Sequence, residues 1–262
     1  MNLIDIKLKQ IRNEKRMGLM THVVVGYPSL KETISLVEVM DQKCADFVEL
    51  QIPFSDPLAD GPTIMKACED SLERGTKVQD AFSVAKKLSS KVKIPLLFMA
   101  YYNTVFKYGV EKFCKDARES GISGLIIPDM PLEEENNEGF SESAKLNKLY
   151  VIRVISPAST LERIKMNIKN ANGFIYCTSR QGTTGSQKQF DPKVIKYMKS
   201  VKELSSIPLA LGFGVTNRYD ADLGYRYADI IVVGSAIVRI AEIYRGEELK
   251  RKVGEFVTSL RV

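Results

Sequence analysis

Short, almost wholly apolar runs recur along the chain, separated by longer stretches of mixed character. The runs are rich in β-branched and aromatic residues and have the length of strands. They cover residues 19–25, 46–50, 95–99, 124–127, 150–155, 173–177, 208–211 and 229–233. Parallel strands that are covered on both faces are apolar throughout, so these eight runs predict a parallel sheet.

Between the runs, apolar residues repeat at intervals of three and four, which is the spacing of an amphipathic helix. One such set follows the first run and comprises Leu30, Ile34, Val37 and Met40. Three further stretches predict additional helices: residues 3–14 before the first run, residues 62–88 with room for two helices, and residues 247–260 after the last run.

Eight strand–helix units in one chain predict the α/β class and a (β/α)8 TIM barrel. We expect a single domain over residues 1–262, with extra helices at the N-terminus, after strand 2 and at the C-terminus. No low-complexity segment and no Pro/Gly/Ser-rich linker divides the chain. An open, doubly wound sheet is the alternative, because alternation alone does not show that the sheet closes.

Composition and charge exclude several classes of protein. The chain has 38 basic and 32 acidic residues, but they are intermixed, and no basic stretch is interleaved with aromatics. We therefore expect no nucleic-acid partner. No apolar run approaches the roughly 18 residues of a membrane span, and the N-terminus has no signal-peptide design, so we expect a cytoplasmic protein without membrane association. With one histidine and no closely spaced cysteine pair, we expect no metal site.

In a barrel of this kind the active site lies at the C-terminal ends of the strands. Strand 2 carries Glu49 between Val48 and Leu50, and side-chain alternation places Glu49 on one face with Phe47 and Gln51. A carboxylate inside a strand is costly to bury unless it is paired or used in chemistry. Glu49 is therefore a candidate general acid–base, and a buried ion pair is the structural alternative.

The loop after strand 2, residues 53–62, contains two further acids and three prolines. The prolines stiffen this loop. Asp56 and Asp60 are equally consistent with turn formation or helix capping, and local sequence does not separate these roles from a functional one.

Glycines cluster where the last three strands end. The segments are residues 178–186 (TSRQGTTGS), 212–215 (GFGV) and 234–235 (GS), the last directly before a predicted helix over residues 236–244. Glycine lets backbone N–H groups approach an anion, and a helix N-terminus favours negative charge. Three such clusters at one end of consecutive strands predict a phosphate site. No lysine at a strand end supports a Schiff-base aldolase, and no His/carboxylate cluster supports a metal-dependent one.

Taken together, the motifs resemble those of tryptophan synthase alpha chains over essentially the whole chain. The most specific segment is residues 47–64 (FVELQIPFSDPLADGPTI). Shorter matching segments follow in the same order: residues 26–28 (GYP), 99–103 (MAYYN), 127–131 (IPDMP), 179–185 (SRQGTTG), 212–215 (GFGV) and 234–238 (GSAIV).

The resemblance implies cleavage of indole-3-glycerol phosphate to indole and D-glyceraldehyde 3-phosphate. Glu49 would be the general acid–base, and Asp60 would bind the indole N–H and stabilise the indolenine. The phosphate would be held by Gly185, Gly214, Gly234 and Ser235. The indole pocket and loop closure would involve His22, Tyr101, Ile126, Asp129, Ile155, Tyr176, Thr184 and Phe213, with Thr184 bonding Asp60 when the strand 6 loop closes.

The resemblance also implies a partner. This half-reaction would need no cofactor, whereas a beta subunit carrying pyridoxal phosphate would receive indole through a tunnel in an α2β2 complex. The loop of residues 53–62, Asn103 and the strand 6 loop would face that subunit. Two positions depart from the usual pattern, because Gln51 stands where a glycine is common and His22 where an aromatic or apolar residue is common.

Other functions remain open from the sequence. A sugar-phosphate isomerase or epimerase would explain the glycine clusters but not the segment from Glu49 to Asp60. A free-standing indole-3-glycerol-phosphate lyase, or a non-catalytic subunit that only activates the beta chain, would share the same motifs. A nucleic-acid-binding module is the weakest alternative.

Overall fold

The computed structural model describes residues 1–179, 192–212 and 214–261, and its strands form a closed barrel of eight parallel strands in sequence order. Closure confirms the predicted (β/α)8 fold and excludes the open sheet. Every strand lies within two residues of its predicted run. The strands are β1 (Gly18–Val24), β2 (Phe47–Gln51), β3 (Leu96–Met99), β4 (Gly124–Ile126), β5 (Tyr150–Ile155), β6 (Ile175–Thr178), β7 (Leu209–Gly212) and β8 (Ile230–Val233).

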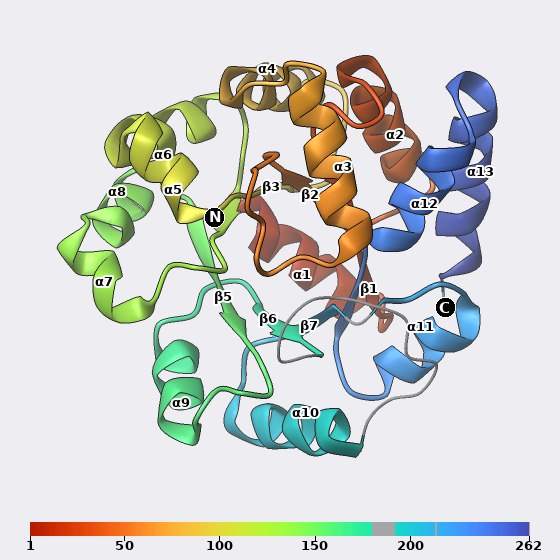
Figure 1. Cartoon of the computed structure of the whole chain (residues 1–262). Coiled ribbons are helices and arrows are strands. Elements are labelled where there is room, and N and C mark those ends of the chain that lie inside the picture. The colour runs from red at the N-terminus through yellow and green to blue at the C-terminus, as the bar shows by residue number, and fades with distance from the viewer. Residues whose placement is uncertain (180–191, 213, 262) are drawn as a thin grey trace.

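Helices surround the strands as an outer ring (Figure 1). The predicted helix before β1, the two helices after β2 and the helix at the C-terminal end are all present. The described helices are α1 (Leu3–Asn13), α2 (Leu30–Gln42), α3 (Pro62–Glu73), α4 (Val78–Ser89), α5 (Tyr102–Tyr108), α6 (Val110–Glu119), α7 (Leu132–Asn137), α8 (Phe140–Leu146), α9 (Leu161–Lys169), α10 (Pro192–Leu204), α11 (Arg218–Tyr225), α12 (Ser235–Ile243) and α13 (Gly246–Ser259).

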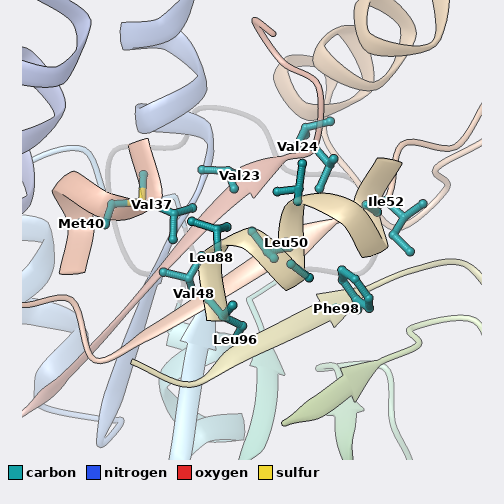
Figure 2. Packing of buried hydrophobic residues seen from close by; sticks show 14 of the residues in the cluster. Val23, Val24, Val37, Met40, Val48, Leu50, Ile52, Leu88, Leu96 and Phe98 are labelled. Carbon is teal, nitrogen blue, oxygen red and sulfur yellow. The ribbon is translucent and has the colours of Figure 1, made fainter. Parts of the chain in front are cut away.

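The outward faces of the strands form the larger core. Val48 and Leu50 of β2 pack outward with Val37 and Met40 of α2 and Leu88 of α4 (Figure 2). The neighbouring residues of β2 point into the barrel instead. Both faces of the strands are therefore buried, which is why the runs lack polar alternation.

Helix α1 closes the N-terminal end of the barrel. Ile4 and Ile11 are buried and belong to the inner core together with Met20 and Phe47. Any Cβ at Gly124, where β4 begins, would lie 2.9 Å from Ile4 Cδ1, so the absence of a side chain there lets the helix pack closely. The opposite end of the barrel is left for chemistry.

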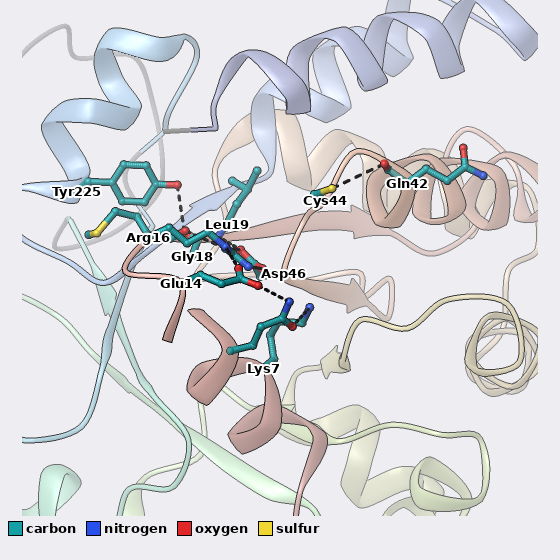
Figure 3. A network of polar contacts seen from close by, with 11 residues as sticks. Lys7, Glu14, Arg16, Gly18, Leu19, Gln42, Cys44, Asp46 and Tyr225 are labelled. Carbon is teal, nitrogen blue, oxygen red and sulfur yellow. Dashed lines mark hydrogen bonds and ion pairs between the residues drawn. The ribbon is translucent and has the colours of Figure 1, made fainter. Parts of the chain in front are cut away.

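A polar network reinforces this closed end (Figure 3). Arg16 donates two hydrogen bonds of 2.7 Å to the two carboxylate oxygens of Asp46, at the start of β2. Asp46 also accepts a 3.0 Å bond from the backbone N–H of Leu19 in β1. The bidentate geometry ties the α1–β1 connection to the β1–β2 pair.

The next features concern membrane spans and cysteines. Among the described residues, no helix is long and apolar enough to cross a membrane. The four cysteines are free thiols, and three of them are buried. The assignment of residues 1–262 to a single domain stays a prediction.

Candidate active site

The inner face of β2 carries a run of polar side chains toward the C-terminal end of the barrel. Phe47 belongs to the inner core, and Glu49 and Gln51 follow it at intervals of two. Glu49 is 3% exposed and Gln51 is fully buried. The structure thus confirms the inward, buried position that alternation predicted for Glu49.

Glu49 faces the only histidine of the chain. The register of β1 and β2 pairs His22 with Glu49, and His22 Nδ1 lies 3.2 Å from Glu49 Oε2. Burial is the largest single influence and would lower the pKa of His22, but the carboxylates of Glu49 and Asp60 together outweigh burial and raise that pKa. The buried pair considered as a structural alternative for Glu49 therefore exists, and its partner is itself a titratable group.

Asp60 is held from two directions in the loop after β2. Gln51 Nε2 donates to Asp60 Oδ2 at 2.7 Å, and the Tyr101 hydroxyl donates to the same oxygen at 2.9 Å. The Tyr101 oxygen in turn accepts a 2.9 Å bond from the backbone N–H of Ala59. Burial raises the pKa of Asp60, and the two donors act against this rise. Asp60 is thus an oriented carboxylate rather than a helix cap.

The opposite wall is formed by β6 and β7. Tyr176 packs against the inner core, and burial raises the pKa of its phenol well above the ordinary value, with the charges of Glu49 and Asp60 adding to the effect. A Cβ at Gly212 would lie 2.9 Å from the Tyr176 hydroxyl, so this glycine makes room for the ring. Ile126 and Tyr101 complete the apolar wall as members of the inner core.

Ile155 does not belong to this pocket, contrary to the expectation from the resemblance. Its side chain packs with Ile164 and Ile175 in a separate cluster outside the barrel, called the outer core below. The preceding residue, Val154, packs against the inner core instead. Neighbouring side chains of a strand point to opposite faces, so only one of the two can line the barrel. Val154 takes the position expected of Ile155.

Two of the predicted phosphate-binding segments follow the neighbouring strands β7 and β8. Gly214 has a positive φ of 80°, which favours glycine. Gly234 directly precedes α12, which begins at Ser235, and no described side chain caps this helix. Its first N–H groups therefore suit an anion. Gly185, Thr184 and Phe213 lie outside the residues that the structure describes.

Comparison with known proteins shows the family of the chain. The family model described as tryptophan synthase alpha chain matches residues 8–261. The chain belongs to the tryptophan synthase alpha chain family. It is 42% identical to the tryptophan synthase alpha chain of Desulfotalea psychrophila, covering 97% of this chain and 98% of that protein, and 40% identical to that of a Thermoanaerobacter species, covering 100% and 99%. A structure of Mycobacterium tuberculosis tryptophan synthase superposes with a TM-score of 0.89 at 30% identity, over 98% of this chain and 96% of that chain.

In this member of the tryptophan synthase alpha chain family, Asp129 connects two loops at the C-terminal end of the barrel. Its carboxylate accepts hydrogen bonds of 2.8 and 3.0 Å from the backbone N–H of Tyr102, at the start of α5. Burial raises the pKa of Asp129. The side chain ties the loop after β4 to the loop after β3, and a contact with indole stays a prediction.

Sequence reasoning missed the contacts made by two of these side chains. Alternation places Gln51 on one face with Glu49, but it does not predict that Gln51 donates to Asp60. The resemblance places Tyr101 in the pocket, but it does not predict that Tyr101 also donates to Asp60. In residues 1–179, 192–212 and 214–261, no group of three or more His, Cys, Asp or Glu side chains could hold a metal ion.

Proposed function

We propose that this lyase cleaves indole-3-glycerol phosphate with Glu49 as general acid–base and Asp60 as the carboxylate that stabilises the indolenine. The observation that carries the proposal is the pair of acids at the C-terminal end of the barrel. Glu49 is buried on the inner face of β2, and Asp60 is oriented by Gln51 and Tyr101. Two carboxylates in different environments suit different roles.

Glu49 acts in two proton transfers. Glu49 delivers a proton to the ring carbon of indole that carries the glycerol chain, and the ring nitrogen becomes part of a cationic indolenine. Asp60 accepts the N–H hydrogen bond and offsets this charge. Glu49 then takes the proton from the glycerol hydroxyl next to the bond, the carbon–carbon bond breaks, and its electrons return to the ring. Indole and D-glyceraldehyde 3-phosphate are released, and Glu49 is again protonated.

The phosphate group would lie after β7 and β8. Gly214, Gly234 and Ser235 present backbone N–H groups there, and the N-terminus of α12 supplies a favourable dipole. Gly185 is proposed for the same role from the resemblance. The indole ring would then lie against Tyr101, Ile126 and Tyr176, close to Asp60.

A pyridoxal-phosphate beta subunit is the proposed partner, in an α2β2 complex. The loop of residues 53–62 displays Leu58, which is 81% exposed, and α5 displays Phe106, which is 56% exposed. Asn103 is exposed on the same helix as Phe106. Apolar side chains displayed beside a catalytic opening suit a subunit interface. A cytoplasmic location and the absence of a cofactor from this chain stay predictions.

The test is indole release from indole-3-glycerol phosphate by the purified chain, with and without a tryptophan synthase beta subunit. We expect weak release by the chain alone and a marked rise when the beta subunit is added. Strong release that the beta subunit does not change would indicate a free-standing lyase. No release in either case would contradict the proposed activity and leave a subunit that only activates its partner.

A further inference from the structure

His22 lies between the two functional parts of the site. The register of β1 places it beside Glu49 on β2, and Thr21, one residue earlier, pairs with Val233, the last residue of β8. Gly234 directly follows β8, so Glu49 on β2, His22 on β1 and Gly234 lie in one row across the end of the sheet. This row connects the acid–base group with the proposed phosphate site.

His22 occupies the space that a side chain at Gly234 would need. A Cβ at Gly234 would lie 3.2 Å from the Cβ, Cγ and Cδ2 atoms of His22. A side chain there would crowd the ring, so the glycine leaves space for the imidazole as well as for an anion. Cδ2, the atom that is bonded to Nε2, is one of the three His22 atoms nearest to this position, and Gly234 directly precedes α12.

The two ring nitrogens of His22 differ in their surroundings. Nδ1 lies 3.2 Å from Glu49 Oε2, whereas Nε2 is buried without a hydrogen-bond partner among the described residues. His22 is only 6% exposed. A buried polar atom without a partner costs free energy, and a ligand that binds it removes this cost.

We infer that His22 binds the glycerol phosphate part of the substrate through Nε2–H while Nδ1–H is shared with Glu49. This inference rests on the proposed function, since it takes the ring end of the substrate to lie near Asp60 and the phosphate near α12. The glycerol chain then has to pass His22 on its way between them. Its hydroxyl and phosphate oxygens are acceptors that match an imidazole N–H.

The same arrangement positions Glu49 for its two proton transfers with the substrate. Nδ1 lies 3.2 Å from Glu49 Oε2 and its N–H orients the carboxyl group, while Glu49 itself gives and takes the protons. Nε2 keeps its proton throughout, so the substrate contact is not broken. The charges facing His22 that favour its protonated form are those of Glu49 and Asp60.

Three substitutions separate the two nitrogens. Asparagine keeps a donor near the position of Nδ1, glutamine keeps one near Nε2, and phenylalanine keeps the ring shape with neither. For His22→Asn we expect the KM for indole-3-glycerol phosphate to rise about tenfold with kcat nearly unchanged. For His22→Gln we expect kcat to fall about tenfold with KM nearly unchanged, and for His22→Phe both effects. Wild-type kcat and KM in all three variants would overturn the inference.

A spectroscopic measurement on the unmodified protein is independent of turnover. His22 is the only histidine, so in protein labelled with 15N-histidine the NMR signals of the imidazole nitrogens can come only from His22. We expect saturating D-glycerol 3-phosphate to shift the Nε2 signal, and we expect Glu49→Gln to lower the pKa of His22. Signals that do not respond to D-glycerol 3-phosphate would overturn the inference, even in an active enzyme. A response in a protein that does not cleave indole-3-glycerol phosphate would support the contact and contradict the proposed function.

Discussion

Two buried acids lie three residues apart in the sequence, Asp46 directly before β2 and Glu49 within it, and they have very different surroundings. Asp46 is 2% exposed and its carboxylate receives two bonds from Arg16 and one from the N–H of Leu19. Glu49 has His22 within 3.2 Å, but its Oε2 has no hydrogen bond of good geometry among the described residues. The fully bonded acid stabilises the fold, whereas the incompletely bonded one is available for a substrate.

The two ends of the barrel repeat this contrast. The N-terminal end is closed by apolar residues of α1 and by the Arg16–Asp46 pair. At the C-terminal end, Glu49, His22 and Gln51 each keep a buried polar atom without a hydrogen-bond partner in the described part of the chain. Such atoms are rare in a stable interior, and the described residues contain two others, in Ser123 and Tyr197. Three neighbouring ones at the C-terminal end indicate a site that a ligand completes.

Replacement of Glu49 should have the largest effect on the reaction. We expect Glu49→Gln to fold normally and to lose about 10²–10⁴-fold in kcat, because the amide cannot transfer the proton. The measurement is indole release together with the melting temperature. Normal release by this variant would sink the proposed mechanism.

Replacement of Asp46 should lower the stability of the fold and leave the reaction unchanged. We expect Asp46→Asn to lower the free energy of unfolding by about 2–4 kcal/mol, because Arg16 loses its charged partner, while kcat per folded molecule stays unchanged. Urea denaturation and the same indole assay would measure both. Asp56→Asn is the matched control, since this exposed acid should change stability by less than about 0.5 kcal/mol. Equal effects of the two variants would remove the structural role assigned to Asp46.

Gln51 extends the comparison one step further along the inner face of β2. Asp60 has to be ionised to stabilise the indolenine, and burial raises its pKa above the ordinary 3.8, so activity should fall as the pH drops through this raised pKa. Gln51→Leu removes a bond to the charged form. We therefore expect kcat/KM to fall about tenfold and the acidic limb of the pH profile to move to higher pH.

Cys68→Ala is the control for this variant. Cys68 Sγ is the other neighbour of Gln51 Nε2, at 3.5 Å, and it makes no bond to Asp60 in the described structure. Its pH profile should match that of the wild type. An acidic limb that shifts in Cys68→Ala but not in Gln51→Leu would show that Gln51 does not act through Asp60.

The smallest effects are expected on β5, where Ile155 packs outside the barrel and Val154 packs inside it. Ile155→Val should lower the free energy of unfolding by about 1 kcal/mol and leave the KM unchanged, because Ile155 lies in the outer core. Val154→Ala should instead raise the KM, since Val154 faces the inner core. A raised KM in Ile155→Val alone would restore the pocket position first expected for Ile155.

Much of the fold and part of the site could be predicted from the sequence. The strand runs, the extra helices and the inward position of Glu49 follow from periodicity, which is a local property of the chain. The face of Ile155 could not be read in this way, because every residue of β5 from Val151 to Ile155 except Arg153 is apolar. An apolar run does not show which of its side chains point inward.

The sequence by itself determined the order of strands and helices, the end of the barrel at which polar and glycine residues gather, and the family. Only the tertiary structure decided which side chains meet. Tyr101 and Asp60 are 41 residues apart and share a hydrogen bond, and His22 reaches Glu49 because of the register between β1 and β2. The physical reason is that periodicity depends on neighbours along the chain, whereas strand register and loop position are set by the packing of the whole barrel.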